Sequence, residues 1–430
     1  MDDLKLILKQ WNPWWIEHKI PKTKTKIPRD FYLEKITKLL NTREIICISG
    51  VRRSGKSTLM YQTIAHLLDK NINPKNILYF NFDTPLQTKH LDLFNKIIDA
   101  YVQLNNPDDK KYFFFDEIQN IPNWEKYIKS HYDLHEDAKF IISGSNSTML
   151  SDKLSTLLTG RIFSINIFPL SFKEYLSFNN FTIKDFDLQK NQIHHHLNNY
   201  FQKGGFPEVV LEKDTGINEE RLKEYLNSIL FKDIVISKNI RESSKLMDLA
   251  IYCLSNISAP LSYNSVSKAI AVNINTIKEY MFFLQQAYLM YQVNYFSYSV
   301  KQSVSIQKPK KIYCIDTALR NSTAFKFSSD TGKIAENIVF LELKRQDKQI
   351  YYWLNNFEVD FVVKNKDNKL TAINVTYTDD IPDRETKGLN EMRQKCRNVD
   401  KCIVITKDAD YIENDIYFIP LWKWLLNNNL

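Results

Sequence analysis

The chain has 430 residues, of which 43% are apolar and 25% are charged, a balance typical of folded globular proteins and unlike that of a disordered chain. Glycine occurs only 9 times, which excludes collagen-like and glycine-linker proteins, because ordinary proteins already carry about 7% glycine. The formal net charge of +8 is compatible with nucleic-acid binding and equally with solvated helix surfaces.

The chain shows no sign of a targeting or membrane segment. Its first residues are acidic at once and lack the apolar core of a signal peptide, and no run approaches the ~18 apolar residues that a membrane-spanning helix needs. The 5 cysteines form no C-x-x-C pair, so neither a disulfide framework nor a zinc ribbon is indicated. We therefore expect a cytoplasmic protein that makes no contact with a membrane.

Residues 1–43 are predicted to form a helical arm with a basic stretch. Pro21 and Pro28 interrupt any helix there. The basic residues that occur without an intervening acid are Lys19, Lys22, Lys24, Lys26 and Arg29. Such a stretch is suited to phosphate contact or to a connecting segment, and we favour the connector.

Residues 44–178 are predicted to form an α/β domain with a doubly wound parallel sheet. Five runs of β-branched and aromatic residues are almost continuously apolar, which is typical of strands buried on both faces. They span Glu44–Gly50, Ile77–Asp83, Lys111–Glu117, Lys139–Ser145 and Arg161–Ile167. The intervals between successive runs leave room for crossover helices.

The middle of the chain has a different pattern. Residues 179–240 are predicted to be helical, and the three histidines at 194–196 are interpreted as surface residues rather than metal ligands. Residues 241–318 show helix, turn and helix followed by two strands, which is the order of a winged helix.

The last segment, residues 319–430, returns to mixed helix and strand. We expect an amphipathic helix over 332–346, paired strands within 350–363, strands at 370–378 and 401–406, and a helical tail.

The strongest motif is Gly50-Val-Arg-Arg-Ser-Gly55-Lys56-Ser57, which matches G-x-x-x-x-G-K-[ST] between a predicted strand and a predicted helix. The two glycines let the backbone N–H groups face a phosphate, and the helix N-terminus adds its dipole. Lys56 is expected to reach the β- and γ-phosphates of ATP, and Ser57 to ligate Mg²⁺. The predicted nucleotide-binding residues are Gly50, Val51, Arg52, Arg53, Ser54, Gly55, Lys56, Ser57 and Thr58.

A second motif completes a predicted ATPase site. The apolar run Phe113-Phe-Phe ends in Asp116 and Glu117. Asp116 is expected to hold Mg²⁺, and Glu117 to act as general base on the attacking water, which favours hydrolysis over mere nucleotide holding. The two side chains take separate roles only because the strand ends here, since neighbouring strand residues point to opposite faces.

Two further polar positions have predicted roles near the γ-phosphate. The fourth strand ends in Ser143-Gly-Ser145-Asn146, where Ser145 or Asn146 could sense that phosphate or simply form a turn; we take Asn146 as the candidate. Arg161 begins the fifth strand, and it is the candidate arginine finger, in its own subunit or in a neighbour's within a homo-oligomer. A structural salt bridge is the competing interpretation of Arg161.

These motifs together resemble those of the prokaryotic AAA-type P-loop ATPases of archaea and bacteria whose C-terminal half is a domain of unknown function. The segments that carry the resemblance are GVRRSGKST, FFFDEIQNIPNWE, FIISGSNSTML, LTGR and PLSFKEYL. The resemblance implies ATP hydrolysis with Mg²⁺, a helical and winged-helix middle, and a C-terminal segment similar to the restriction-endonuclease fold.

The C-terminal segment departs from an active nuclease. Such folds place a helix Glu, a strand Asp and then E-x-K around Mg²⁺ and a water. Glu336 and Asp360 match the first two positions, whereas Asn374 and Thr376 stand where E-x-K is expected. We therefore predict a nuclease-like domain without cleavage activity, in which Glu336 and Asp360 serve as structural or binding residues.

The predicted winged helix has a basic loop at 301–311 that could grip phosphates, with Tyr295, Phe296 and Tyr298 nearby for stacking. Its second helix is poor in base-reading side chains, so DNA contact and intramolecular packing remain equal alternatives. We expect a Mg²⁺-dependent ATPase that couples hydrolysis to domain rearrangement and acts on DNA. The alternative is a nucleotide-gated switch or scaffold that acts on a protein partner.

Overall fold

The computed structural model describes residues 2–84, 92–135, 137–146, 157–299, 308–323, 330–365, 367–378 and 380–427. The chain divides into two compact units, Met1–Ile167 and Phe168–Leu430, and each is described by itself.

The first unit is built on a five-stranded parallel sheet, as predicted. The strands are β1 (Ile45–Ser49), β2 (Ile77–Asn81), β3 (Lys111–Asp116), β4 (Ala138–Gly144) and β5 (Ile162–Asn166). Their order across the sheet is β2-β3-β4-β1-β5. Strand β4 therefore lies between β1 and β3, and the carboxyl ends of these three strands meet at one edge.

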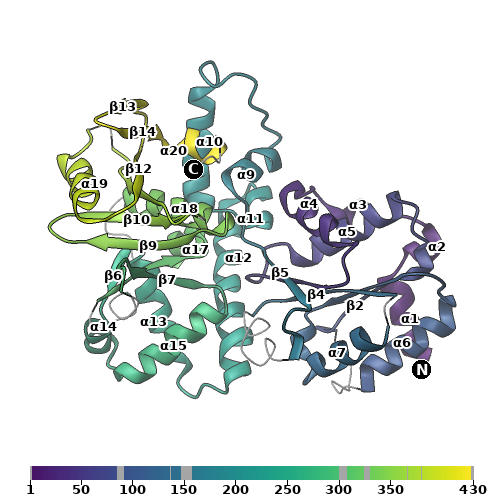
Figure 1. The fold of residues 1–430 in the computed structure, drawn as a ribbon. Coiled ribbons are helices and arrows are strands. Elements are labelled where there is room, and N and C mark those ends of the chain that lie inside the picture. Colours follow the sequence, from purple (N-terminus) through teal and green to yellow (C-terminus); the bar gives the residue numbers. More distant parts are fainter. Residues whose placement is uncertain are drawn as a thin grey trace. The chain divides into compact units, whose positions relative to one another are not determined.

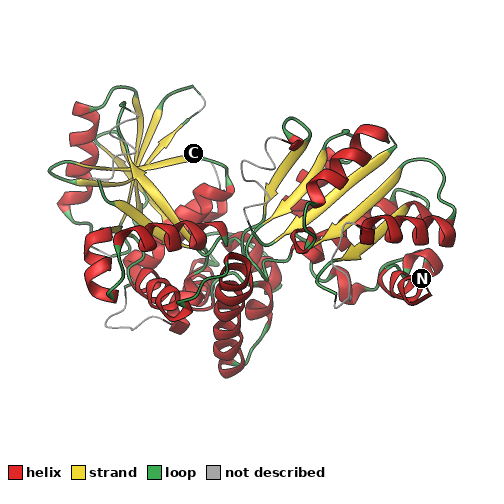
Figure 2. Ribbon diagram, turned by 90° about the horizontal axis from the view of Figure 1, so that it is seen from below, coloured by secondary structure: helices red, strands yellow, loops and turns green. Residues whose placement is uncertain are grey.

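Helices cover both faces of this sheet, with α4 and α5 over one face and α6 and α7 over the other (Figures 1 and 2). Residues of β1 and β4 are buried throughout, as expected for strands covered on both faces. The helical segments between and after the strands are α5 (Lys56–Asp69), η1 (Pro74–Asn76), α6 (Asp92–Asn105), η2 (Ile118–Asn120) and α7 (Trp124–Leu134).

The N-terminal arm packs on this unit, so the expectation of a connector is wrong. Its helices are α1 (Asp2–Trp11), α2 (Trp14–Glu17), α3 (Lys22–Thr25) and α4 (Asp30–Leu39). The Asn12 side chain exchanges two hydrogen bonds with the backbone of Tyr79 on the edge strand β2, and the Trp14 indole donates to Ile77 O. These side chains satisfy backbone groups that an uncovered edge strand would leave open.

The second unit begins with helices, as predicted from the loss of strand signals. They are α9 (Phe172–Phe178), α10 (Lys190–Lys203), α11 (Pro207–Leu211), α12 (Thr215–Ser228), the π-helical η4 (Ile229–Ile236) and α13 (Ser243–Ser255). Ser171 and Glu174 form a capping box that defines the start of α9. His194 pairs with Asp408 at 2.9 Å, and no three histidine, cysteine or acidic residues of the described chain form a metal-binding group.

Two helices and three short strands follow. After α13 come β6 (Ala259–Leu261), α14 (Tyr263–Ile270), α15 (Ile274–Gln286), β7 (Met290–Tyr295) and β8 (Lys310–Cys314). Ser262 and Asn273 accept backbone N–H bonds at the starts of α14 and α15, which fixes the turn between these helices. Strand β8 pairs antiparallel with both β6 and β7.

The remaining elements extend the same sheet. They are α17 (Thr317–Thr323), α18 (Thr331–Arg345), β9 (Gln349–Leu354), β10 (Glu358–Lys364), β11 (Leu370–Val375), α19 (Asp383–Lys395), β12 (Val399–Thr406), β13 (Tyr411–Glu413), β14 (Ile416–Pro420) and α20 (Leu421–Asn427). The strand order is β13-β14-β12-β11-β10-β9-β7-β8-β6. The parallel pairing of β7 with β9 joins the three-stranded part to the rest.

The predicted helical tail is partly wrong, because β13 and β14 precede α20. Asn414 and Asp415 adopt positive φ values of 50° and 58° between these strands, the conformation of a tight hairpin turn. Ile416 and Phe418 are buried while Tyr417 between them is partly exposed, so the alternation of a strand was present in the sequence.

The basic loop at 301–311 is only partly exposed to solvent. Lys301 lies outside the described residues, whereas Lys311 is buried on β8. Phe296 belongs to the hydrophobic core around Trp353 and Val359, so its predicted stacking role is wrong. Tyr298 is exposed, and its hydroxyl donates to Arg397 O.

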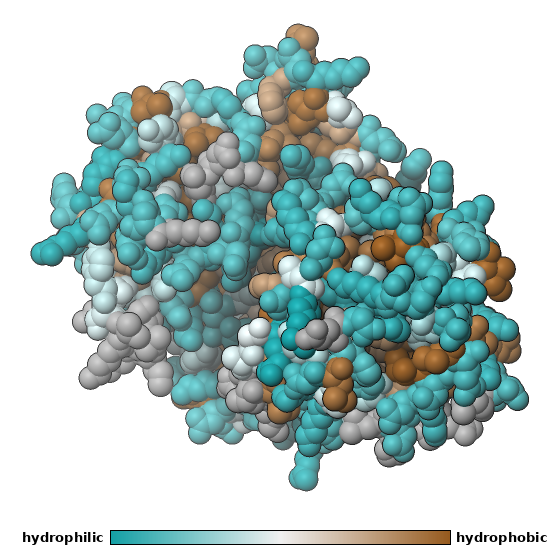
Figure 3. Space-filling view, turned by 45° about the vertical axis from the view of Figure 1, so that its right-hand side comes forward, coloured by the Kyte–Doolittle hydropathy of each residue, from teal (hydrophilic) through white to brown (hydrophobic). Residues whose placement is uncertain are grey.

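Hydrophilic side chains dominate the face drawn in Figure 3, and apolar ones lie in small separate groups. Within the described residues, every helix is too short or too polar to cross a membrane.

Candidate nucleotide-binding site

The phosphate-loop motif lies where the sequence predicts it, between β1 and the start of α5. Gly50 follows β1 with a φ of 144°, and a Cβ atom there would lie 2.2 Å from Ile167 O. Both the positive φ and this close approach require glycine. Gly55 precedes α5 with a φ of 99°, so the chain turns left-handed before the helix begins and its first N–H groups face the loop.

Lys56, the first residue of α5, is 4% exposed and folds back over the loop. Its Nζ donates to Gly50 O at 3.0 Å and to Val51 O at 3.1 Å, and it lies 3.9 Å from a carboxylate oxygen of Glu117. Neutral carbonyls compensate an ammonium only in part, since charged partners form hydrogen bonds about twice as strong as neutral ones. The ammonium is therefore held in place and still available to an incoming anion.

Asp116 ends β3 and is fully buried at the centre of a hydroxyl cluster. Ser57 Oγ donates to its Oδ2 at 2.5 Å and Tyr79 Oη donates at 2.8 Å, while Ser143 Oγ donates to Oδ1. Burial and the adjacent Glu117 raise the pKa of Asp116, and the hydrogen bonds from Ser143, Ser57 and Tyr79 oppose this rise. The two predicted oxygen ligands of Mg²⁺, from Ser57 and Asp116, are thus in direct contact.

Glu117 has a strained backbone. Its φ of 52° is left-handed, a conformation that costs a non-glycine residue about 1–3 kcal/mol and is concentrated at functional sites. The Glu117 carboxylate lies 3.9 Å from Lys56 Nζ. The backbone N–H of Glu117 donates to Ser143 Oγ at 3.2 Å, and Gln119 Nε2 donates to its carboxylate at 2.5 Å.

The end of β4 contributes to the same edge because β4 lies between β1 and β3. Ser143 contacts both Asp116 and the backbone of Glu117. Ser145 accepts a long hydrogen bond of 3.5 Å from Gln119, and Asn146 is buried beside it. The motif continues into residues 147–150, which lie outside the described residues.

Arg161 lies at the amino ends of the strands, and the phosphate loop lies at their carboxyl ends. Its carbonyl accepts from Ile45 N at 2.8 Å, at the start of β1, and β1 spans about 16 Å from there to Gly50 at ~3.3 Å per residue. The guanidinium pairs with Asp133 at 3.3 Å and lies over the Tyr132 ring. The structure therefore does not bring Arg161 to the phosphate loop of its own subunit, and its role as a finger remains a prediction that requires a second subunit.

Several site residues were not predicted. Tyr79 and Asn81 on β2 both donate to Asp116. Asn81 ends this strand, and that position was the available signal, whereas Tyr79 lies in the middle of the strand and carried none. Arg29 of the arm is buried, and its Nη1 donates to Ser54 O in the phosphate loop at 2.8 Å. No local pattern indicates that contact, because residues 25 positions apart meet only through the packing of α4 on α5.

The site fits a nucleotide with its metal ion. A loop with exposed backbone donors, a lysine ammonium, a hydroxyl and a buried carboxylate are the groups that bind a Mg²⁺–nucleotide complex. Of the other predicted loop residues, Val51 and Ser54 are buried, and Arg52, Arg53 and Thr58 are in contact with solvent.

Comparison with sequence families agrees with this geometry. Residues 42–176 match the family described as AAA domain, and residues 194–331 and 331–424 match two domains of unknown function, DUF8612 and DUF4143. An uncharacterized protein of Methanocaldococcus jannaschii is 32% identical over 89% of this chain and 88% of its own length. An uncharacterized protein of Haemophilus influenzae is 30% identical over 94% of this chain and 100% of its own length.

Among solved structures, a Walker-type ATPase of Pyrococcus abyssi covers 69% of this chain and 95% of its own, with 13% identity and a TM-score of 0.44. The Aeropyrum pernix ORC1 protein in complex with DNA covers 73% and 96%, with 11% identity and a TM-score of 0.33. At these scores the likenesses carry no argument about function.

Proposed function

This chain belongs to the family of AAA-domain proteins that includes uncharacterized members from Methanocaldococcus jannaschii and Haemophilus influenzae, and we propose that it hydrolyses ATP with Mg²⁺. The observation that carries the proposal is the contact between Ser57 and Asp116, with Lys56 and Glu117 beside them. These four side chains come from two segments 59 residues apart in the sequence.

Each group has a chemical role in this proposal. Lys56 leaves the carbonyls of Gly50 and Val51 and pairs with the β- and γ-phosphates. Ser57 and Asp116 hold Mg²⁺, which, when bound, neutralises charge on the phosphate oxygens. Glu117 accepts a proton from the attacking water, and Gln119, hydrogen-bonded to its carboxylate, orients it. Asn146 at the end of β4 contacts the γ-phosphate.

We further propose that hydrolysis rearranges the second unit and that this unit acts on DNA. The support is the order α13-β6-α14-α15-β7-β8 with its antiparallel strand pairs, which is that of a winged helix. The start of α15 exposes Asn273 and Asn275, side chains able to read base edges. The loss of Lys311 and Phe296 to the interior leaves Lys308, Lys310 and Tyr298 as the described part of the wing surface.

A protein partner is the second candidate, and exposed apolar side chains favour it. Phe231 and Ile236 on η4 and Phe282 on α15 are all substantially exposed, and η4 contacts α15. Exposed apolar groups on neighbouring elements are common at protein interaction surfaces. In this case the ATPase would act as a slow nucleotide-gated switch.

The ATPase rate decides between the two partners. We would measure it with duplex, single-stranded and branched DNA and without nucleic acid, at two salt concentrations, with Glu117→Gln as the control. Stimulation that weakens with salt and disappears in the variant supports action on DNA. A rate indifferent to every nucleic acid rejects the DNA proposal, and a wild-type rate no higher than that of Glu117→Gln rejects hydrolysis at this site.

A further inference from the structure

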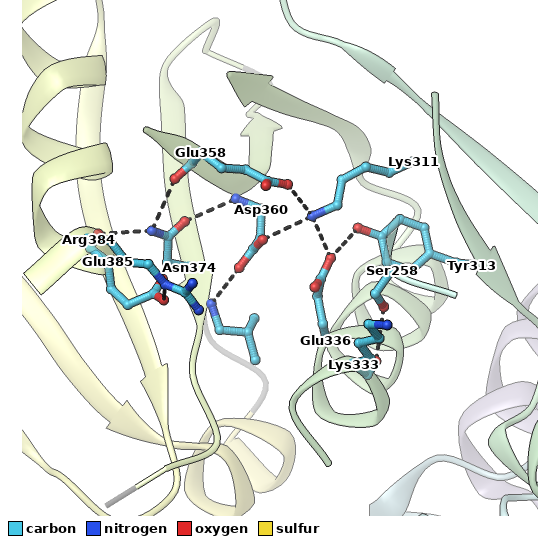
Figure 4. Close-up of polar contacts among 11 residues, drawn as sticks. Ser258, Lys311, Tyr313, Lys333, Glu336, Glu358, Asp360, Asn374, Arg384 and Glu385 are labelled. Carbon is cyan, nitrogen blue, oxygen red and sulfur yellow. Dashed lines mark hydrogen bonds and ion pairs between the residues drawn. The ribbon is translucent and has the colours of Figure 1, made fainter. Parts of the chain in front are cut away.

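A buried lysine lies among three carboxylates in the second unit (Figure 4). Lys311 is 1% exposed, and its Nζ lies 2.7 Å from Glu336 Oε1, 2.7 Å from Glu358 Oε1 and 3.0 Å from Asp360 Oδ1. The three acids come from two elements, since Glu336 lies on α18 and the other two lie on β10. The lysine comes from β8, in the part of the sheet that resembles a winged helix.

Two of these acids match a sequence pattern of metal-dependent nucleases. Glu336 and Asp360 stand where the sequence resemblance predicts the Mg²⁺-binding helix and strand residues of the restriction-endonuclease fold. Mg²⁺ requires near-octahedral oxygen ligands at about 2.0–2.1 Å. The ammonium of Lys311 instead lies at hydrogen-bond distance from one oxygen of each acid, and it fills the point where the three carboxylates converge.

The third nuclease position is also occupied by groups with other functions. Asn374 Oδ1 accepts from Asp360 N at 3.0 Å, and its Nδ2 donates to Glu385 O at 2.9 Å. The second oxygen of Asp360 accepts from Val375 N at 2.9 Å, and Tyr313 Oη donates to Glu336 Oε1 at 2.7 Å. Groups other than Lys311 thus also hold these carboxylates in place, and the side facing the point of convergence is taken by the ammonium (Figure 4).

The charges agree with this arrangement. Burial alone would lower the pKa of Lys311, but Asp360, Glu336 and Glu358 outweigh it and keep the ammonium charged. A buried ammonium is tolerated only when paired in this way. Across the described residues, no histidine, cysteine, aspartate or glutamate group of three has the geometry of a metal site.

We propose that Lys311 takes the place of a divalent metal ion in this carboxylate centre and ties β8 to α18 and β10. The centre is then a fixed internal ion cluster that cannot activate a water for cleavage. The proposal does not depend on ATP hydrolysis, because all of its residues lie in the second unit.

Removal of the ammonium should convert the centre into a metal site. In the full chain without nucleotide, Ser57→Ala serves as the parent, because it removes one of the two predicted metal ligands of the nucleotide site and so weakens metal binding there. Mn²⁺ binding is followed by electron paramagnetic resonance at about pH 8, because the vacated carboxylates must be deprotonated to bind metal. Thermal unfolding with and without Mn²⁺ provides a second readout.

We expect no tight Mn²⁺ binding in the parent and one bound ion, at least about 10-fold tighter, after Lys311→Ala. The unfolding temperature of Lys311→Ala should fall by about 10 °C because three buried acids lose their cation, and saturating Mn²⁺ should restore at least half of this loss. Adding Asp360→Asn should abolish both effects. Lys310→Ala is the matched control on the same strand and should change neither.

Two results would overturn the proposal. One is a Mn²⁺ ion already bound by the parent and lost with Asp360→Asn, since the carboxylates would then hold a metal beside Lys311. The other is a Lys311→Ala protein that binds no more Mn²⁺ than the parent. If Lys311→Ala does not fold without metal, refolding with Mn²⁺ that depends on Asp360 supports the proposal, and failure to refold with Mn²⁺ rejects it.

Discussion

The two units each bury a lysine near carboxylates, and the two lysines are held in different ways. Lys56 in the first unit donates to two backbone carbonyls and lies 3.9 Å from Glu117. Lys311 in the second unit lies within 3.0 Å of oxygens from three acids. Coulomb energy grows as distance shortens and as water is excluded, so Lys311 is bound far more firmly in its place.

This difference is what we expect between the proposed phosphate-binding cation, Lys56, and the proposed structural cation, Lys311. Neutral carbonyls hold Lys56, and in our proposal an anion replaces them because it offers stronger hydrogen bonds. Asp116 accepts from hydroxyl groups and Glu117 from an amide, and only Glu117 lies near the ammonium, at 3.9 Å. Lys311 already has three charged partners, so an exchange of partners would weaken its interactions. Both lysines are buried, and the identity of their partners distinguishes them.

We expect the largest effect from Lys56→Met, on the ATPase activity. The ATPase rate should fall by about 10²–10³-fold or more, because the cation that stabilises charge on the transferred phosphate is lost. Without nucleotide, the unfolding temperature should change little, since Lys56 contributes only two hydrogen bonds to carbonyls. Steady-state hydrolysis and thermal unfolding measure the two quantities. A variant that loses stability but keeps its rate would show that Lys56 is the structural cation instead.

The next effect is a change in the pH dependence of stability in the second unit. Burial and the nearby Asp360 raise the pKa of Glu336 to about 8, from 4.5. The folded protein therefore binds this proton more tightly than the unfolded chain. The resulting stability is present below about pH 4.5 and is lost as the pH rises to about 8, by on the order of a few kcal/mol.

Glu336→Gln should remove this dependence, because an amide does not titrate and can still accept the bonds from Tyr313 and Lys311. Between about pH 5 and 9 the variant should lose less stability than the wild type, as measured by thermal unfolding at each pH. Glu391→Gln is a control of opposite sign. Burial raises the pKa of Glu391, but hydrogen bonds from Lys395 and Asn355 lower it to about 2, so its effect should appear only at acid pH. Parallel wild-type and Glu336→Gln profiles would contradict the assignment.

The smallest expected effect is on stability, from the substitution of Lys24, a lysine that contacts aromatic rings. Lys24 in the N-terminal arm has its Nζ 5.3 Å from the ring centroid of Trp11 and 4.8 Å from that of Tyr61. Aromatic faces attract a cation weakly at a partly exposed position, so Lys24→Met should cost no more than about 1 kcal/mol. Denaturant unfolding of the full chain tests this. A loss comparable to that of Lys311→Ala would mean that partner charge does not explain the difference between these lysines.

Local sequence predicted much of the first unit. All five strands, the helix at the phosphate loop and the positions of Lys56, Ser57, Asp116 and Glu117 followed from apolar runs and motif spacing. The arm was predicted less well, because its packing depends on Asn12 and Trp14 meeting the edge of β2, which no periodicity indicates. The roles of Ser143, Tyr79 and Arg29 depend in the same way on contacts between distant segments.

The sequence by itself determined that the chain contains a phosphate loop after a buried strand and an acidic pair after another, since both patterns are local. Only the tertiary structure decided which charges meet. The strand order places β4 between β1 and β3 and brings Ser143 to Asp116, while it leaves Arg161 at the far edge. Lys311 looked like one more lysine of a basic loop, and it became an internal cation because its side chain meets Glu336 of α18 and Asp360 of β10. The function of a charged side chain depends on the groups that it contacts, and these contacts depend on how distant segments of the chain pack together.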